Sequence, residues 1–344
     1  MTDSAWPFAP WLRIERGGRA EAILQGALVV RDDRGQVRAR WGDPGWPSYL
    51  RSGVKMIQAV PLVASGAADR WDLEPRHLAV CCASHSGETA HLTAVREILE
   101  RCGADESMLH CGAHAPFHAG SAEELVRGGE RPRPIHHDCS GKHAGMMATC
   151  AHRGQDVAGY WRRDHPLQQE IHDVLAALAD VDGMPWAVDG CGVPTWHLPL
   201  DAFALALARF VGGAGPAAEY AGAADRLVRA MQSHPEMVGG TGRFCTALPR
   251  AANRPLIAKA GAEGLYAVAW REEDGRGVAL CAKAAAGDAR SRDFAVTEAA
   301  AQLGLLDEAG LEALAEFHGA PLRNWAGEVV GNRVGLLRLS PQEG

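Results

Sequence analysis

Hydrophobic and polar residues follow two different patterns along the chain. Near both ends, apolar β-branched residues stand in short runs, whereas in the middle apolar residues recur every three or four positions. The stretches "ALVVRDDRGQVRARWG" and "GLYAVAWREEDGRGVALCAKA" each place a glycine-containing acidic turn between two such runs, which predicts a hairpin. We therefore expect antiparallel strands within residues 10–50 and 250–340.

The residues between these ends predict helices, mainly over residues 89–250. From Ser52 onward apolar residues recur at helical spacing, and Pro61 should kink or shorten that helix. "TAHLTAVREILERCG" (89–103) is amphipathic and should end at Gly103. "HLAVCCAS" (77–84) is a short apolar run that ends in small polar residues, which predicts a buried strand.

Together these elements predict a mixed α/β fold of the α+β type. Its central, mainly antiparallel sheet would combine N-terminal and C-terminal strands, flanked by helices from the middle of the chain. A length of 344 residues suits one large domain or two closely associated ones, and we expect a single compact domain over residues 1–344.

Composition excludes several classes of protein. The chain is 47% hydrophobic and 22% charged, which is typical of globular proteins, and its net charge of -7 predicts no nucleic-acid surface. "MTDSAWPFAP" lacks the pattern of a signal peptide, and no apolar run approaches the roughly 20 residues of a membrane-spanning helix. The nine scattered cysteines favour reduced thiols, so we expect a cytoplasmic protein.

The stretch "YLRSGVKMIQAVP" places Ser52 three residues before Lys55, where the apolar spacing predicts the start of a helix. Residues three apart share one helix face, so a lysine at this spacing can activate the serine as a nucleophile. The same S-x-x-K spacing occurs in serine β-lactamases and penicillin-binding proteins. Alternatively, Ser52 is a helix cap and Lys55 a solvated charge, and the spacing alone leaves both readings open.

Two further stretches carry hydroxyl or amine groups. "CCASHSGE" (81–88) ends in Ser84, His85 and Ser86, which either line a site or form a turn that caps the next helix. In "KAGAEG", Lys259 ends a predicted strand before a glycine-rich turn. It is either a surface charge or a buried cation, as in the K-T-G element of the S-x-x-K enzymes.

A metal site is the third candidate. "HHDCSGKHAG" and "DGCGVP" each place a cysteine in a turn with glycine, namely Cys139 and Cys191. Thiolates with a nitrogen donor bind zinc, and Lys142 or His143 would supply the nitrogen, although lysine must first lose its proton. Alternatively, both cysteines are small buried hydrophobes and Lys142 is a surface charge.

Considered together, these stretches resemble the rhizobial-type L-asparaginase II family. "RSGVKMIQAVPLV", "CCASHSGE", "CGAHAP", "HHDCSGKHAGMMA", "DGCGVP" and "KAGAEG" stand in the family's order, and the resemblance runs from about residue 10 to 340. It implies a serine β-lactamase-like fold, a homodimer, and hydrolysis of L-asparagine to L-aspartate and ammonia. Two departures are "KMIQ" after the first lysine, where the family has "KP", and Gly53-Val54 in place of Ser-Ala.

The resemblance also implies roles for individual residues. Two Ser–Lys pairs would be catalytic, with Ser52 as the nucleophile and Lys55 as its base, while the second pair assists. A zinc ion would stand beside them, and three residues would line the substrate pocket. The second pair is Ser84 and Lys259, the zinc ligands are Cys139, Lys142 and Cys191, and the pocket residues are Arg51, His143 and Asp189.

Two rival functions stay open at the level of sequence. One is a related serine amidase, glutaminase or β-lactamase-like hydrolase that acts on another amide. The other is a non-catalytic homologue that binds zinc or an amino acid. Release of ammonia from asparagine, compared with glutamine and a β-lactam, separates the three.

Overall fold

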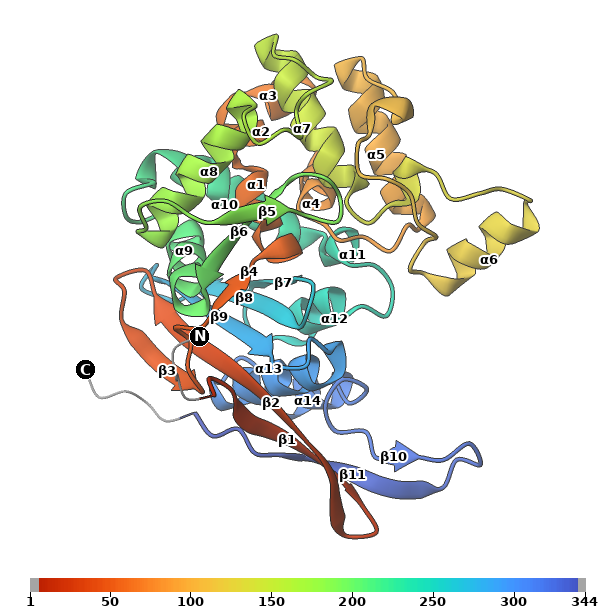
Figure 1. Cartoon of the computed structure of the whole chain (residues 1–344), viewed down its shortest axis with the longest axis vertical. Coiled ribbons are helices and arrows are strands. Elements are labelled where there is room, and N and C mark those ends of the chain that lie inside the picture. The colour runs from red at the N-terminus through yellow and green to blue at the C-terminus, as the bar shows by residue number, and fades with distance from the viewer. Residues whose placement is uncertain (1–5, 340–344) are drawn as a thin grey trace.

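The computed structural model describes residues 6–339 and shows antiparallel sheet and helices in one mixed α/β arrangement (Figure 1). The largest sheet has eight strands in the order β10-β11-β1-β2-β9-β8-β7, with β3 also paired to β2. A second sheet has three strands in the order β4-β6-β5. Every strand pair is antiparallel, which confirms the predicted pairing.

The strands of the large sheet come from the two ends of the chain, as the hydrophobic pattern predicts. The hairpin of β2 and β3 turns at the "DDRG" stretch, and that of β8 and β9 at "EEDGRG". The strands are β1 (Ala9–Arg16), β2 (Arg19–Asp32), β3 (Val37–Trp41), β4 (Pro47–Tyr49), β5 (Trp186–Val188), β6 (Pro194–Pro199), β7 (Leu256–Ala260), β8 (Leu265–Arg271), β9 (Gly277–Ala284), β10 (Leu322–Arg323) and β11 (Val329–Gly335).

Most helices come from the middle of the chain and lie above the large sheet in Figure 1, whereas the two helices that follow β9 lie beside its lower part. The helices are α1 (Lys55–Gln58), α2 (Val60–Ala64), α3 (Ala67–Arg70), α4 (Pro75–Cys81), α5 (Thr89–Cys102), α6 (Ala119–Arg127), α7 (Ser140–Arg153), α8 (Pro166–Ala179), α9 (Leu200–Gly212), α10 (Ala221–Ser233), α11 (Pro235–Val238), α12 (Phe244–Ala251), α13 (Ala289–Gln302) and α14 (Glu308–Ala313). Short 3₁₀ turns add η1 (Arg51–Val54), η2 (Glu106–Met108), η3 (Pro134–His136) and η4 (Ala218–Tyr220).

The centre of the large sheet is covered on both faces. Successive residues of β8 and β9 are buried rather than alternately buried and exposed. Since neighbouring side chains on a strand point to opposite faces, apolar partners must lie on each side. Helices α9 and α13 both pack on these strands. The central strands therefore lie between helices on both faces, and this buried sheet fixes the positions of the helices that pack on it.

The predicted strand over residues 77–84 is wrong, because residues 75–81 form helix α4. Residues 77–81 of this helix are all buried, so this run shows no polar face and its sequence resembles that of a buried strand. A helix start signal was nevertheless present. Pro75 occupies the first turn, where its missing N–H costs nothing, and the backbone N–H of Glu74 donates to Nδ1 of His77 at 3.0 Å.

Helix α4 ends beside the start of α7, and glycines allow the two to approach closely. A Cβ atom on Gly141 would stand 2.3 Å from the carbonyl oxygen of Val80, and one on Gly145 would stand 2.8 Å from Sγ of Cys81. This contact brings the residues that follow α4, including Ser84, next to those that begin α7, including Cys139.

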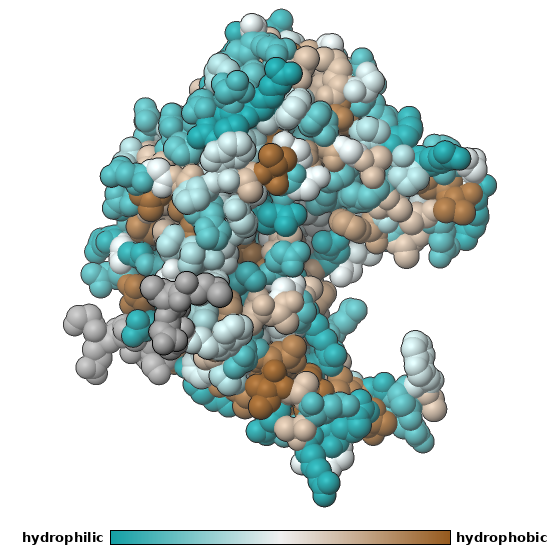
Figure 2. Space-filling model, viewed as in Figure 1, coloured by the Kyte–Doolittle hydropathy of each residue, from teal (hydrophilic) through white to brown (hydrophobic). Residues whose placement is uncertain are grey.

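The other predicted elements fall close to their expected positions. Helix α5 ends at Gly103, which adopts the left-handed conformation expected of a C-terminal cap. The helix that follows Ser52 divides into α1 and α2 around Ala59, two residues before Pro61. Residues 6–339 include no helix with the length and apolar character needed to cross a bilayer. On the face shown in Figure 2, hydrophobic residues lie in separate patches.

Candidate active site

Ser84 lies between two lysines that come from different parts of the fold. Its hydroxyl oxygen stands 2.9 Å from Nζ of Lys55, at the start of α1, and 2.8 Å from Nζ of Lys259, in β7. All three residues are buried, and both lysines are fully inaccessible to solvent. The alternative readings of Lys55 and Lys259 as surface charges are therefore wrong. Each Nζ also donates to a carbonyl oxygen, that of Ala83 for Lys55 and that of Ala260 for Lys259.

The two lysines differ in charge because their neighbours differ. Burial lowers the pKa of Lys259 to about 7, and the positive charge of Lys55 adds to this effect. Burial also opposes the charge of Lys55, but the negative charges of Cys139 and Asp138 outweigh it and raise the pKa of that amine. Near neutral pH the site thus holds a charged Lys55 and a Lys259 that can be neutral.

Asp138 forms an ion pair with Lys55, the charged lysine of the two. Its Oδ2 lies 3.7 Å from Nζ of Lys55, and its Oδ1 lies 3.1 Å from Nδ1 of His137 and 3.5 Å from Nε2 of His114. Burial opposes ionisation of Asp138, but Lys55 and the two histidines lower its carboxyl pKa well below the ordinary value. Asp138 is a functional candidate that the sequence analysis missed, although it stands beside Cys139 in "HHDCSG".

His114, His137 and Asp138 bring three potential metal-binding atoms within 4.8 Å of one another. Two of these atoms already have other partners. Nε2 of His114 accepts the backbone N–H of Asp138 at 3.0 Å, and Nδ1 of His137 accepts that of Cys139 at 3.0 Å. This group therefore fixes the loop before α7 and does not form a good metal site.

Ser52 lies in η1, one helical turn before Lys55, and its side chain is partly exposed. Within residues 6–339 no hydrogen bond joins the Ser52 hydroxyl to Lys55, whose amine is instead directed to Ser84. The predicted S-x-x-K pair is thus present as two neighbours on one face rather than as a formed hydrogen bond. Of the two serines, Ser52 is the one open to solvent.

Arg51 and Asp189 form an ion pair at the entrance to η1. Arg51 has a φ of +47°, a left-handed conformation that is uncommon outside glycine. The contact of its side chain with Asp189 and the hydrogen bond from its N–H to Oγ1 of Thr195, at 3.0 Å, hold it there. Asp189 belongs to the turn between β5 and β6 that also carries Cys191, so the pair connects this turn to Ser52.

The three predicted zinc ligands meet in one buried place. The thiols of Cys139 and Cys191 are hydrogen-bonded to each other, and Nζ of Lys142 lies 3.0 Å from Sγ of Cys191. The hydrogen bond from Cys191, together with Lys55 and Lys142, lowers the pKa of Cys139 well below that of an ordinary thiol. Two sulfur donors, of which Cys139 is the more readily ionised, meet one amine in a buried site. This donor set fits zinc once the amine has lost its proton.

His143 lies in the first turn of α7, four residues after the N-cap residue Cys139 and next to Lys142 in the chain. Its Nδ1 is 2.6 Å from the hydroxyl oxygen of Tyr160, and its Nε2 is buried with no hydrogen-bond partner among residues 6–339. Burial and the nearby Lys142 lower its pKa, so the ring is neutral. The structure thus brings this predicted pocket residue close to the cysteine pair.

Lysine content is a signal that could have identified this site from sequence. The chain has 35 basic residues, of which only Lys55, Lys142, Lys259 and Lys283 are lysines. Three of these four lie in the cluster described above, and all three are buried. In a chain that uses arginine almost everywhere, the few lysines are therefore the residues to examine first, because an amine can lose its proton and a guanidinium cannot.

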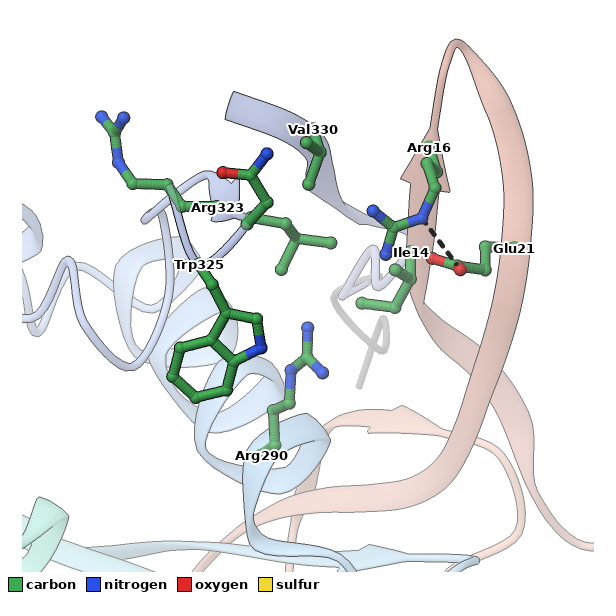
Figure 3. A pocket seen from close by; sticks show the side chains of 9 residues that line it. Ile14, Arg16, Glu21, Arg290, Arg323, Trp325 and Val330 are labelled. Carbon is green, nitrogen blue, oxygen red and sulfur yellow. Dashed lines mark hydrogen bonds and ion pairs between the residues drawn. The ribbon is translucent and has the colours of Figure 1, made fainter. Parts of the chain in front are cut away.

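A separate groove of about 530 Å³ is lined by residues outside this cluster. It lies between the β1–β2 hairpin, β10–β11 and the start of α13 (Figure 3). Figure 3 shows Trp325 beside Arg290, and Arg16 paired with Glu21. None of the predicted site residues lines this groove. Its lining residues are Ile14, Arg16, Glu21, Arg290, Leu322, Arg323, Asn324, Trp325 and Val330.

Comparison with known proteins identifies the family. The comparison with individually curated proteins gave no match. The family model for L-asparaginase II matches residues 12–334, which is nearly the whole chain and includes every residue of the cluster around Ser84. Members of this family are amidohydrolases of the asparaginase type, which act on a small molecule. The chain belongs to the L-asparaginase II family, as its sequence motifs predicted.

Proposed function

We propose that this protein hydrolyses L-asparagine to L-aspartate and ammonia, with Ser52 as the nucleophile and a Lys55–Ser84–Lys259 relay that moves its proton. The observation that carries the proposal is the position of the Ser84 hydroxyl, 2.9 Å from one buried amine and 2.8 Å from the other. Burial of two amines beside one hydroxyl costs folding free energy, because burial disfavours their charged forms. A function in proton transfer would explain why the fold retains them.

Accessibility favours Ser52 over Ser84 as the nucleophile. A nucleophile must reach the side-chain amide carbon of the substrate, and Ser52 is partly exposed whereas Ser84 is only 8% exposed. Both amines already occupy the hydroxyl of Ser84. Ser52 also lies at the start of a helical segment, where its own backbone N–H would stabilise an oxyanion, since those of Arg51 and Gly53 already donate to Thr195 and Leu50.

The resting charges define the first step. Lys55 is charged and cannot accept a proton, but Lys259 has a pKa of about 7 and can. Ser84 passes its proton to Lys259 while Lys55 gives one to Ser84, which leaves Lys55 neutral next to Ser52. A neutral Lys55 is then the base that the Ser52 hydroxyl requires.

Attack completes the transfer. Oγ of Ser52 forms a bond to the amide carbon, Lys55 takes the hydroxyl proton, and the carbonyl oxygen becomes an oxyanion. Lys55 then protonates the leaving nitrogen, the C–N bond breaks, and ammonia departs from a Ser52 ester. Water attacks that ester with Lys55 as base, and Lys55 returns the proton to Oγ of Ser52 as the ester C–O bond breaks and L-aspartate is released. The relay then runs backward, so that Lys259 is neutral and Lys55 is charged again.

Three residues are proposed to bind the substrate. Arg51 carries a positive charge suited to the α-carboxylate, and Asp189 a negative charge suited to the α-amine, so the two would exchange part of their ion pair for substrate. His143 offers the unpaired Nε2 described above. Zinc held by Cys139, Lys142 and Cys191 would supply a fixed positive charge that orients the substrate and secures the turn at Cys191.

Three wider features belong to the same proposal. An antiparallel sheet with an S-x-x-K serine at a helix start and a lysine on a sheet strand supports a serine β-lactamase-like fold. The family resemblance supports a homodimer. Nine unpaired cysteines support a reducing, cytoplasmic location.

Ammonia release tests the proposed function. Wild type should release ammonia from L-asparagine and much less from L-glutamine, and Ser52→Ala and Ser84→Ala should each lose at least about 10²-fold in kcat/KM. Ser233→Ala is the control, because that serine lies at the exposed end of α10. Turnover of glutamine or a chromogenic β-lactam in preference to asparagine would favour the rival hydrolase. Binding of asparagine without ammonia would favour a binding protein.

A further inference from the structure

Tyr160 is a fully buried tyrosine in the segment between α7 and α8, and its hydroxyl connects two parts of the candidate site. The backbone N–H of His110 donates to this hydroxyl at 2.9 Å. On its other side the hydroxyl lies 2.6 Å from Nδ1 of His143. The two rings stand nearly perpendicular, at 84°.

Counting protons fixes the direction of the second hydrogen bond. The Tyr160 oxygen already accepts from His110, so its own proton needs an acceptor, and Nδ1 of His143 is the acceptor within reach. If Nδ1 carried a proton instead, the hydroxyl proton of Tyr160 would have no acceptor among residues 6–339. Tyr160 therefore donates, and a neutral ring with a free Nδ1 lone pair carries its proton on Nε2.

Tyr160 is held firmly enough to impose this orientation. Its carbonyl oxygen accepts a hydrogen bond from Nε2 of Gln168 at 2.9 Å, and Gln168 is itself fully buried. The ring of His110 stacks on that of Trp161 with centroids 3.8 Å apart. A Cβ atom on Gly192 would stand 2.8 Å from the His110 ring, so the same segment supports the turn that contains Cys191.

Within the described residues 6–339, the Nε2–H of His143 is a buried donor without an acceptor. Buried donors are rarely left unpaired, and those that are call for an explanation. His143 follows the N-cap residue Cys139 by one helical turn, and the charges of Lys142 and Lys55 both act on its ring, so an acceptor brought by the substrate to these amines would meet this donor.

We propose that Tyr160 is a positioning residue, whose hydroxyl fixes His143 in the Nε2–H form so that this N–H donates to an oxygen of the bound substrate. The role of the donor rests on the proposed amidohydrolase function, whereas the tautomer depends on the fold alone. The experiment therefore has one part that needs no substrate and one that does.

The first part is NMR of protein labelled with ¹⁵N-histidine, at pH 7.5. His143→Asn identifies the His143 signals, and in wild type these should show a neutral ring protonated at Nε2. In Tyr160→Phe the ring should populate the Nδ1–H form or average between the two. Tyr266→Phe is the matched control, because this other fully buried tyrosine lies in β8 and packs on Phe244 rather than on His143, so it should leave the signals unchanged.

The second part is a double-mutant cycle in kcat/KM for L-asparagine. Tyr160→Phe should lower kcat/KM about 10–100-fold, as is typical when a group that orients a ligating or catalytic residue is removed. The variant His143→Asn retains an acceptor near the Nδ1 position but removes the Nε2 donor. In that background Tyr160→Phe should change kcat/KM less than about threefold, since it acts only through His143.

Two results would overturn the inference. A wild-type His143 that is charged, or protonated at Nδ1, refutes it without any measurement of activity. Additive losses in the cycle would show that Tyr160 acts on the fold and not through His143. If wild type releases no ammonia but the tautomer depends on Tyr160 as stated, the proposed function fails and the positioning role stands.

Discussion

Lys259 gives the sharpest prediction, because its buried amine has a pKa of about 7. In the proposed relay only neutral Lys259 can accept the proton that frees Lys55, so activity requires the deprotonated form. Activity should therefore rise with pH through about 7 and level off above it. The opposite sign would apply if Lys259 acted as an acid.

The size of the effect follows from simple titration. With a pKa of about 7, roughly 90% of Lys259 is neutral at pH 8 and about 10% at pH 6. We expect kcat/KM for L-asparagine to fall about tenfold between these two pH values. The assay is ammonia release from pH 5.5 to 9, with circular dichroism at each pH to show that the protein stays folded.

Arginine at position 259 isolates the titrating amine. A guanidinium keeps its charge at every pH in the assay and cannot accept a proton, so Lys259→Arg should lose about 10²–10⁴-fold. Lys283→Arg is the matched control, since its Nζ also donates to the next carbonyl, at 2.8 Å, on strand β9. A kcat/KM constant within twofold from pH 6 to 8, or a midpoint above 9, would refute the reasoning.

Three further predictions concern charge, metal and packing. Asp138→Asn removes the carboxylate beside Lys55 and should lower kcat/KM about 10²-fold, a loss that Asp274→Asn on an exposed turn should not reproduce. Chelation of zinc should raise KM for asparagine and lower the thermal midpoint. Loss of kcat with KM intact would contradict the substrate-binding role of the metal. Gly141→Ala should destabilise by about 1–3 kcal/mol in chemical unfolding, because its Cβ would stand 2.3 Å from a carbonyl oxygen. Gly222→Ala, with open space around it, should be neutral or stabilising by up to about 1 kcal/mol.

Local signals explain which parts of the fold sequence could predict. The hairpins at "DDRG" and "EEDGRG" depend on turn residues and neighbouring runs, so both are read correctly from short windows. Helix α4 was missed because all of its central residues are buried, which removes the polar face that distinguishes a helix from a strand. Glu74 and Pro75 are the local signal that distinguishes the two, because proline is favoured in the first turn of a helix.

The candidate site depends on contacts between residues that are far apart in the sequence, which local patterns cannot predict. Ser84 and Lys259 are 175 residues apart, and no periodicity can place them 2.8 Å from each other. The family resemblance supplied that pairing, and the structure supplies the geometry. Tyr160 stands in no motif quoted for the family, so its contact with His143 emerges only from the folded chain.

The central claim is that Ser52, not Ser84, forms the covalent intermediate. The most direct measurement is acid quench of wild type during turnover of L-asparagine, followed by peptide mass mapping of the aspartyl ester. Our account predicts the ester on the peptide that contains Ser52, and its absence from Ser52→Ala. An ester on Ser84 would contradict it.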